Sequence, residues 1–121
     1  MTLKNGHKDL IVWQKLLDLA DAVYALTREF PKEETYGLIS QMRRCAVSIP
    51  SNIAEGSGRK TMNDFKQFLA VAYGSALELE TQLLLSQRFG YGHSLKITLA
   101  HNLLDEVLRM LNKMTAPRPS D

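Results

Sequence analysis

Apolar residues recur at alternating steps of three and four along almost the whole chain, in four separate runs. This spacing places them on one face of an α-helix. It predicts helices at about residues 9–30, 33–56, 62–89 and 94–115, with short connections and no competing strand. We therefore predict an all-α fold in a single domain over residues 1–121, an antiparallel up-down-up-down four-helix bundle.

Proline positions refine this prediction. Pro31 ends the first run, because a residue that precedes proline is pushed out of helical geometry. Pro50 falls inside the second run, where it removes one backbone donor and crowds the carbonyl of Ala46. The apolar row continues in phase on both sides of Pro50, so the second helix is predicted to be kinked there and not to stop.

The first run carries more apolar residues than one bundle core can bury. One stripe recurs at alternating steps of three and four, and it consists of Leu10, Trp13, Leu17, Ala20, Tyr24 and Thr27. A second apolar stripe consists of Val12, Leu19 and Leu26. An arc this wide indicates contacts on two sides of the helix. We therefore assign Val12, Leu19 and Leu26 to an oligomer interface between copies of the chain.

The residues that metal or catalytic sites need are few and scattered. Cys45 is the only cysteine, so neither an internal disulfide nor a cysteine-based metal cluster can form. The histidines do not make the paired Glu-x-x-His motifs of bundle metal sites. His101 and Asp105 are one helical turn apart, a spacing more typical of an exposed pair than of metal ligands. We expect no enzymatic activity, no metal and no cofactor.

The apolar runs are too short for a membrane protein. None approaches the roughly 18 residues that a transmembrane helix requires. The run from Leu10 to Val12 is broken by polar residues before an export signal could form. We expect a cytoplasmic protein with no membrane contact.

Two basic pairs lie on the second helix and just after it. Arg43 and Arg44 interrupt the helix opposite its apolar row, and Arg59 with Lys60 follows roughly 24 Å further along the axis. Repeated around a ring of subunits, these candidate residues would form a basic band that follows a phosphate backbone. Alternatively, Arg43 or Arg44 pairs with glutamates such as Glu78 or Glu80 of a neighbouring helix or subunit. Both interpretations stay open.

Polar residues also surround Pro50, namely Ser48, Ser51, Asn52 and Glu55. Such side chains often bond the carbonyls that a proline disturbs. A polar network at a subunit interface would use the same residues, and the sequence does not choose between the two.

The order of several motifs resembles a known family. Trp13 and Phe30-Pro31 precede Glu34-Thr35-Tyr36-Gly37-Leu38, and the most specific run extends from Gln41 to Gly56. This pattern resembles the bacterial four-helix bundle family of 23S rRNA intervening-sequence proteins. The accessory variability determinant of diversity-generating retroelements is a more distant relation. Cys45 stands where alanine is usual.

The resemblance implies a four-helix protomer that assembles into a homopentamer, with links to RNA genes or to a reverse transcriptase. It supplies no catalytic residue. The predicted function is therefore a non-enzymatic homo-oligomeric scaffold or adaptor that binds structured RNA or DNA, or a nucleic-acid enzyme. The alternative is an oligomeric bundle with a protein or small-molecule partner and no nucleic-acid role.

Overall fold

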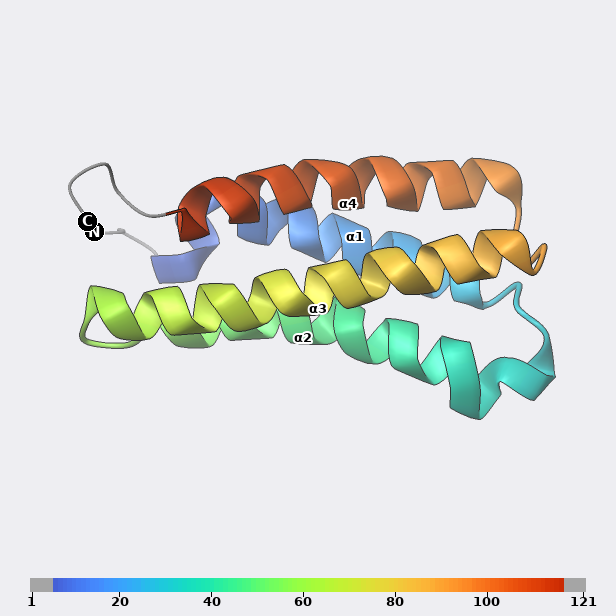
Figure 1. The fold of residues 1–121 in the computed structure, drawn as a ribbon, viewed down its shortest axis with the longest axis horizontal. Helices are drawn as coiled ribbons and strands as arrows, with labels where there is room; N and C mark the ends of the chain where they lie inside the picture. Colours follow the sequence, from blue (N-terminus) through green and yellow to red (C-terminus); the bar gives the residue numbers. More distant parts are fainter. Residues whose placement is uncertain (1–5, 117–121) are drawn as a thin grey trace.

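Four long helices account for most of the chain in the computed structural model, which describes residues 6–116. They are α1 (Ile11–Thr27), α2 (Ser40–Ser57), α3 (Met62–Arg88) and α4 (Ser94–Thr115), with no strand among the described residues. The chain reverses direction from each helix to the next (Figure 1). The predicted all-α four-helix bundle is confirmed, although residues 1–5 and 117–121 of the predicted domain lie outside the described residues.

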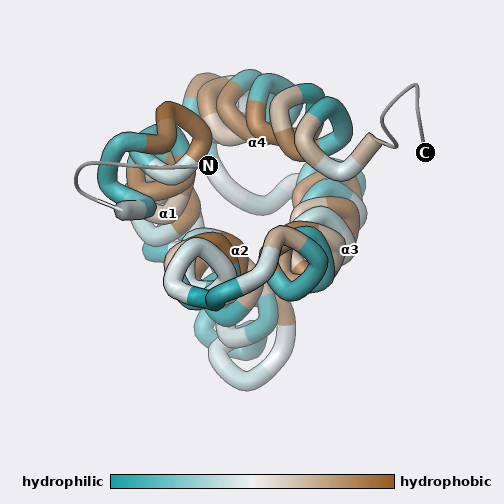
Figure 2. The backbone as a smooth tube through the Cα atoms, turned by 90° about the vertical axis from the view of Figure 1, so that its left-hand side faces the viewer, coloured by the Kyte–Doolittle hydropathy of each residue, from teal (hydrophilic) through white to brown (hydrophobic). Residues whose placement is uncertain are grey.

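The helices occupy the corners of a square in chain order when the bundle is viewed from its end (Figure 2). Each packs against the helices before and after it, and α1 also packs against α4. The helix faces that meet at the centre consist of aliphatic side chains, and Leu16, Ile49, Leu79 and Leu104 are almost completely buried there. Burial of this continuous apolar core is the main force that holds the helices together.

The core-facing stripe of α1 requires a correction. Val12, Leu19 and Leu26 are 2%, 0% and 0% exposed and belong to the protomer's own core. They cannot contact another subunit, and their assignment to an oligomer interface was wrong. The positions of α2 and α4 decide which of the two stripes turns inward. The other stripe stays partly accessible, with Leu17 exposed and Trp13 half-buried.

The connection between α1 and α2 is longer and more structured than predicted. A short 3₁₀ turn, η2 (Lys32–Glu34), is followed by a wide π-type turn, η3 (Thr35–Ile39), before α2 begins at Ser40. The Glu34 carboxylate accepts hydrogen bonds from the Leu38 N–H at 3.2 Å and from the Tyr91 hydroxyl at 3.0 Å. These contacts hold the segment in place where a regular helix was expected from residue 33.

Pro50 lies inside α2, which continues through it to Ser57. The Ser51 hydroxyl donates to the Val47 carbonyl at 2.7 Å, and the Asn52 amide donates to the Ser48 carbonyl at 2.8 Å. Both bonds are made within the helix, one turn back along the chain. Neither bond reaches the Ala46 carbonyl that Pro50 deprives of its helical donor, so both interpretations of these polar residues stay open, and the kink at Pro50 stays a prediction.

Glycine sets the spacing between α2 and α3. Gly56 is buried in the last turn of α2, and a Cβ atom there would lie 2.6 Å from Cβ of Phe68. No such atom fits without movement of a helix, so Gly56 permits the close approach of α3. The Thr61 hydroxyl then starts α3 by accepting a hydrogen bond from the Asp64 N–H at 3.1 Å.

Candidate nucleic-acid interface

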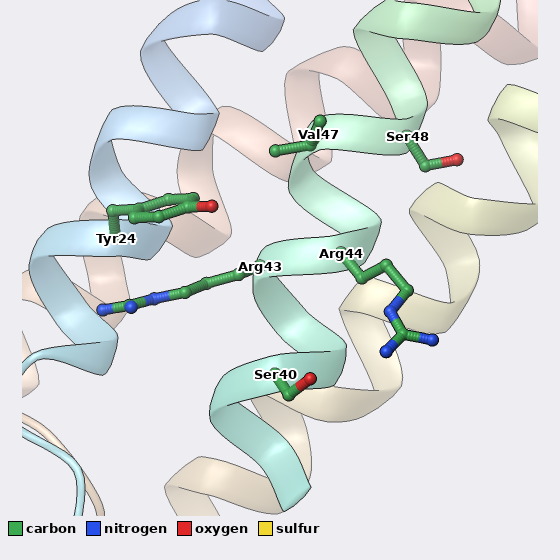
Figure 3. A pocket seen from close by; sticks show the side chains of 6 residues that line it. All are labelled: Tyr24, Ser40, Arg43, Arg44, Val47 and Ser48. Atoms are coloured by element: carbon green, nitrogen blue, oxygen red, sulfur yellow. The ribbon is translucent and has the colours of Figure 1, made fainter. Parts of the chain in front are cut away.

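Arg43 reaches from α2 to α1. Its guanidinium lies 4.5 Å from the centre of the Tyr24 ring, and its Nε donates to the Thr27 hydroxyl at 2.9 Å. Figure 3 shows the two side chains lying one above the other. The cation is therefore engaged by an aromatic face and a hydrogen bond, and Arg43 ties two helices of the same protomer together.

Arg44 points the other way. In Figure 3 its side chain leaves α2 on the side opposite Tyr24. It is exposed and lines a polar pocket of about 330 Å³ that Glu78 of α3 also lines. Among residues 6–116, however, neither Arg44 nor Glu78 takes part in an ion pair. Arg44 thus presents an exposed positive charge that forms no ion pair within the described residues.

The second basic pair lies at the other end of α2. Arg59 contacts the Glu55 carboxylate at 3.1 Å and lies 4.9 Å from the centre of the Phe68 ring. An exposed pair of this kind contributes little stability, so a phosphate can compete for Arg59 at little cost. Lys60 follows in the exposed turn before α3. The structure therefore separates the four predicted residues by exposure: Arg43 is half-buried between α1 and α2, and the other three are exposed, although Arg59 is also bound within the protomer.

Tyr36 is an exposed aromatic residue that the sequence placed in a family motif but not among the candidate site residues. It is 95% exposed, and it lies in η3 one turn before Ser40, which lines a pocket with Arg44. The helix predicted from residue 33 would have included Tyr36 as an ordinary surface position. The fixed turn instead holds the ring out in solvent, where a base can stack on it.

A shallow groove runs along the surface between α1 and α2. One hollow of about 280 Å³ is apolar, with Trp13, Leu17 and Ala20 facing Val47 and Pro50. A second hollow of about 430 Å³ adds Asp21 and Arg28, and a third of about 520 Å³ is lined by Arg43 and Arg44. Because Val47 lines all three hollows, they form one surface, called here the α1–α2 groove, that is apolar at one end and basic at the other.

Cys45 is not a reactive nucleophile. The thiol is buried between α2 and α3. Burial, followed by the nearby Glu78 carboxylate, raises the pKa of the thiol to about 11. The neutral thiol therefore persists at neutral pH, and Cys45 behaves as a small apolar residue.

His101 and Asp105, whose spacing is more typical of an exposed helix pair than of metal ligands, form no hydrogen bond with each other among the described residues. The Asp105 carboxylate instead accepts a hydrogen bond from Arg109 at 2.7 Å. Within the described part of the chain, no three histidine, cysteine or carboxylate side chains are grouped so that they could hold a metal ion. In the same residues, no helix combines the length and the apolar character that a membrane crossing requires.

Comparison with known proteins extends these observations. Residues 8–113 match the family described as 23S rRNA-intervening sequence protein. A crystal structure of a protein of unknown function from the S23 ribosomal protein family of Bacteroides thetaiotaomicron has a similar fold, with a TM-score of 0.78 and 24% identity. That match covers 88% of this chain and 100% of the other. No curated protein matches the chain. The family match spans nearly the whole bundle, and the chain belongs to the 23S rRNA-intervening sequence protein family.

Proposed function

We propose that the protein is a non-enzymatic, homo-oligomeric adaptor of the cytoplasm that binds structured RNA or DNA through the outer side of α2. The observation that carries the proposal is Arg44, an exposed cation with no ion-pair partner among the described residues. Arg59 and Lys60 add positive charge at the far end of the same helix. The family description makes ribosomal RNA the first nucleic acid to test.

The chemistry of this surface favours backbone contacts over base recognition. Arginine and lysine neutralise phosphates and release counterions, which makes binding steeply dependent on salt. Ser40, Ser48 and the exposed Val47 line the same pocket as Arg44. Tyr36 adds a stacking surface that accepts any base. Binding with weak sequence preference follows from this combination.

An Arg44→Ala variant tests the proposal. Its affinity for a ribosomal RNA hairpin should fall, and the slope of log K against log salt should lose about one unit for each phosphate contact removed. Fluorescence anisotropy at several salt concentrations measures both quantities. Arg109→Ala is the matched control, because it removes the same charge from an exposed arginine of α4. Unchanged binding by Arg44→Ala, with assembly intact, would remove Arg44 from the interface.

Tyr36→Ala separates stacking from charge. Loss of the ring should weaken binding without changing the salt slope, because no phosphate contact is removed. Tyr36→Phe should bind like the wild type. A binding loss that Phe does not restore would contradict the stacking role.

The homo-oligomer in this proposal is a pentamer, as the resemblance to the family implies. Light scattering should then give a mass of about 69 kDa, five times the 13.7 kDa of one chain. A mass of 13.7 kDa at micromolar concentration would overturn this part of the proposal.

A protein partner without a nucleic-acid role is the second candidate. The exposed leucines of α3, such as Leu77 and Leu84, favour it, because apolar side chains gathered on one helix face are typical of protein interfaces. The resemblance to the family suggests a reverse transcriptase as this partner. Co-purification with such an enzyme, together with absence of RNA and DNA binding by the isolated protein, would favour this candidate.

A further inference from the structure

The outward face of α3 is apolar over most of its length. Between residues 70 and 85, seven of its eight exposed residues carry no charge, and the eighth is Glu78. The seven uncharged residues are here called the α3 stripe: Ala70, Val71, Gly74, Leu77, Thr81, Leu84 and Leu85. The stripe spans about 22 Å at the rise of an α-helix. Leu77 and Leu84 are 42% and 50% exposed, and no other helix of the protomer covers them. A continuous apolar ridge of this length is typical of a surface that another protein buries.

Gly74 lies in the middle of this stripe. A glycine inside a helix lowers helix stability, and it is usually kept where a close approach requires it. Gly56 has such a reason within the protomer, since a Cβ atom there would collide with Phe68. A Cβ atom on Gly74 would meet nothing within 4 Å. The space above Gly74 therefore suits the close approach of a second molecule.

The chain itself carries a surface that matches the stripe. The α1–α2 groove is hollow and apolar at one end, with Trp13, Leu17 and Pro50 in its walls. In the end view α1 and α3 stand at opposite corners of the bundle, so the groove and the stripe face different sides (Figure 2). A single protomer cannot join them.

The charges of the two surfaces are complementary. Arg28 and Arg43 line the basic part of the groove beside a single acidic residue, Asp21, whereas the Arg44 side chain leaves α2 on the side away from α1 (Figure 3). Between Lys66 and Arg88, by contrast, the only charged residues of α3 are Glu78 and Glu80. Opposite charges at the margins of two apolar surfaces fix the register of an interface and steer the partners together.

We infer that the α3 stripe of one copy packs into the α1–α2 groove of the next. This inference rests on the homo-oligomeric part of the proposed function and names the surfaces that build the assembly. Because stripe and groove differ and lie on separate sides, the contact is heterologous, and it closes into a ring when the rotation between neighbours allows. It also replaces the interface that the sequence had assigned to the buried stripe of α1.

Two sets of substitutions test the two surfaces separately. Leu77→Glu with Leu84→Glu places charge on the stripe, and Val47→Glu places charge in the groove. All three positions are exposed, and glutamate is a good helix former, so each variant should keep its helical circular dichroism. Leu95→Glu with Leu99→Glu is the matched control, since these leucines of α4 are exposed but lie outside both surfaces. We expect each test variant to fall to the 13.7 kDa monomer in light scattering and the control to keep the wild-type mass.

Mixing the two monomeric variants gives the decisive measurement. Each retains one intact surface, so the stripe of the Val47→Glu variant can still enter the groove of the other. A dimer of about 27 kDa, twice the mass of one chain, should form. No larger oligomer should follow, because the stripe and the groove left unpaired in this dimer are the substituted ones. No pair on mixing, or an assembled Val47→Glu variant, would overturn the inference in favour of a contact between identical surfaces. Dissociation of the α4 control would also overturn it.

The outcomes also separate this inference from the proposed function. A wild type that stays monomeric overturns the inference together with the homo-oligomeric part of the function. An intact assembly that binds neither RNA nor DNA overturns the nucleic-acid role and leaves the inference standing. Loss of assembly on Arg44→Ala would place Arg44 in the subunit contact and remove it from the nucleic-acid surface.

Discussion

Arg43 and Arg44 are adjacent in the sequence, yet they do different things. Neighbouring residues of a helix point about 100° apart, so one arginine faces α1 and the other faces away from it. Arg43 is held by the Tyr24 ring and the Thr27 hydroxyl, whereas Arg44 ends in solvent. The sequence treated the two as one basic pair because both are cations at neighbouring positions. Their contacts assign a structural role to Arg43 and leave the recognition of phosphate to Arg44.

Replacement of Arg43 by alanine should therefore lower the free energy of unfolding. The variant loses a hydrogen bond from a charged donor and a cation–π contact, together worth about 1–2 kcal/mol. Urea unfolding followed by circular dichroism measures the change. Arg44→Ala is the control on the same helix and should stay within about 0.5 kcal/mol of the wild type, because it breaks no contact within the protomer. Equal losses in both variants would contradict the division of roles.

At the scale of elements, one end of the bundle is closed by polar contacts between α1 and the start of α4. The Glu29 carboxylate accepts a hydrogen bond from the His93 N–H at 2.8 Å and pairs with Lys96. The Phe30 and Tyr91 rings pack beside it, with centres 5.4 Å apart. Together these contacts fix where α4 begins. They bring together residues more than 60 positions apart in the chain, so helical periodicity does not report them.

This end should respond to acid through Glu29. The hydrogen bond from Lys96 and then that from the His93 N–H lower the pKa of the Glu29 carboxyl below its ordinary value of 4.5. A lowered pKa in the folded state stabilises the fold above the ordinary value, and this contribution is lost as the pH falls through the folded pKa. Glu29→Gln should therefore be less stable than the wild type at pH 7, and the difference should shrink as the pH falls below about 4.

Urea midpoints of both proteins at a series of pH values check this expectation. Asp18→Asn is the control, since it neutralises an exposed carboxylate of α1. Its difference from the wild type should not follow the same course. A Glu29→Gln difference that is constant from neutral to acid pH would show that the contact does not depend on the charge.

For the whole molecule, local signals predicted the second half of the bundle best. The predicted helix at 62–89 is observed as Met62–Arg88, and the one at 94–115 is observed as Ser94–Thr115. Capping residues and glycine turns define these ends, and both are visible in the sequence. The start of α2 was predicted at residue 33 but is observed at Ser40, seven residues later, after the turns η2 and η3. Within these turns Glu34 bonds to Tyr91, a long-range contact that helical periodicity does not report.

The candidate site was predicted less well than the fold. Periodicity identified two apolar stripes on α1, but it does not show which of them faces the core, because neighbouring helices set the rotation of a helix about its axis. Val12, Leu19 and Leu26 were predicted to face outward, whereas they face the core. The α1–α2 groove could not be predicted either, since it requires Leu17 and Val47 to face each other across two helices. Residue type did identify Arg44, Arg59 and Lys60 as surface cations.

Assembly and nucleic-acid binding should be coupled at this scale. Each subunit of a ring presents one basic surface, so a long RNA can contact several at once, and linked contacts raise the apparent affinity by about 10²–10⁴-fold. The monomeric Leu77→Glu, Leu84→Glu variant keeps Arg44, Arg59 and Lys60, but it offers a single surface. Its affinity for a long structured RNA should fall by about 100-fold or more, with a shallower salt slope.

A short hairpin that can reach only one basic surface provides the internal reference. The monomeric variant and the wild type should bind this hairpin with similar affinity, because the contacts of one subunit are unchanged. The Leu95→Glu, Leu99→Glu protein adds the same two negative charges outside the interface and should retain tight binding of the long RNA. Anisotropy titrations of both ligands against the three proteins measure this pattern. Equal loss for the hairpin and the long RNA would show that the α3 stripe itself touches nucleic acid, and that affinity does not come from repetition around a ring.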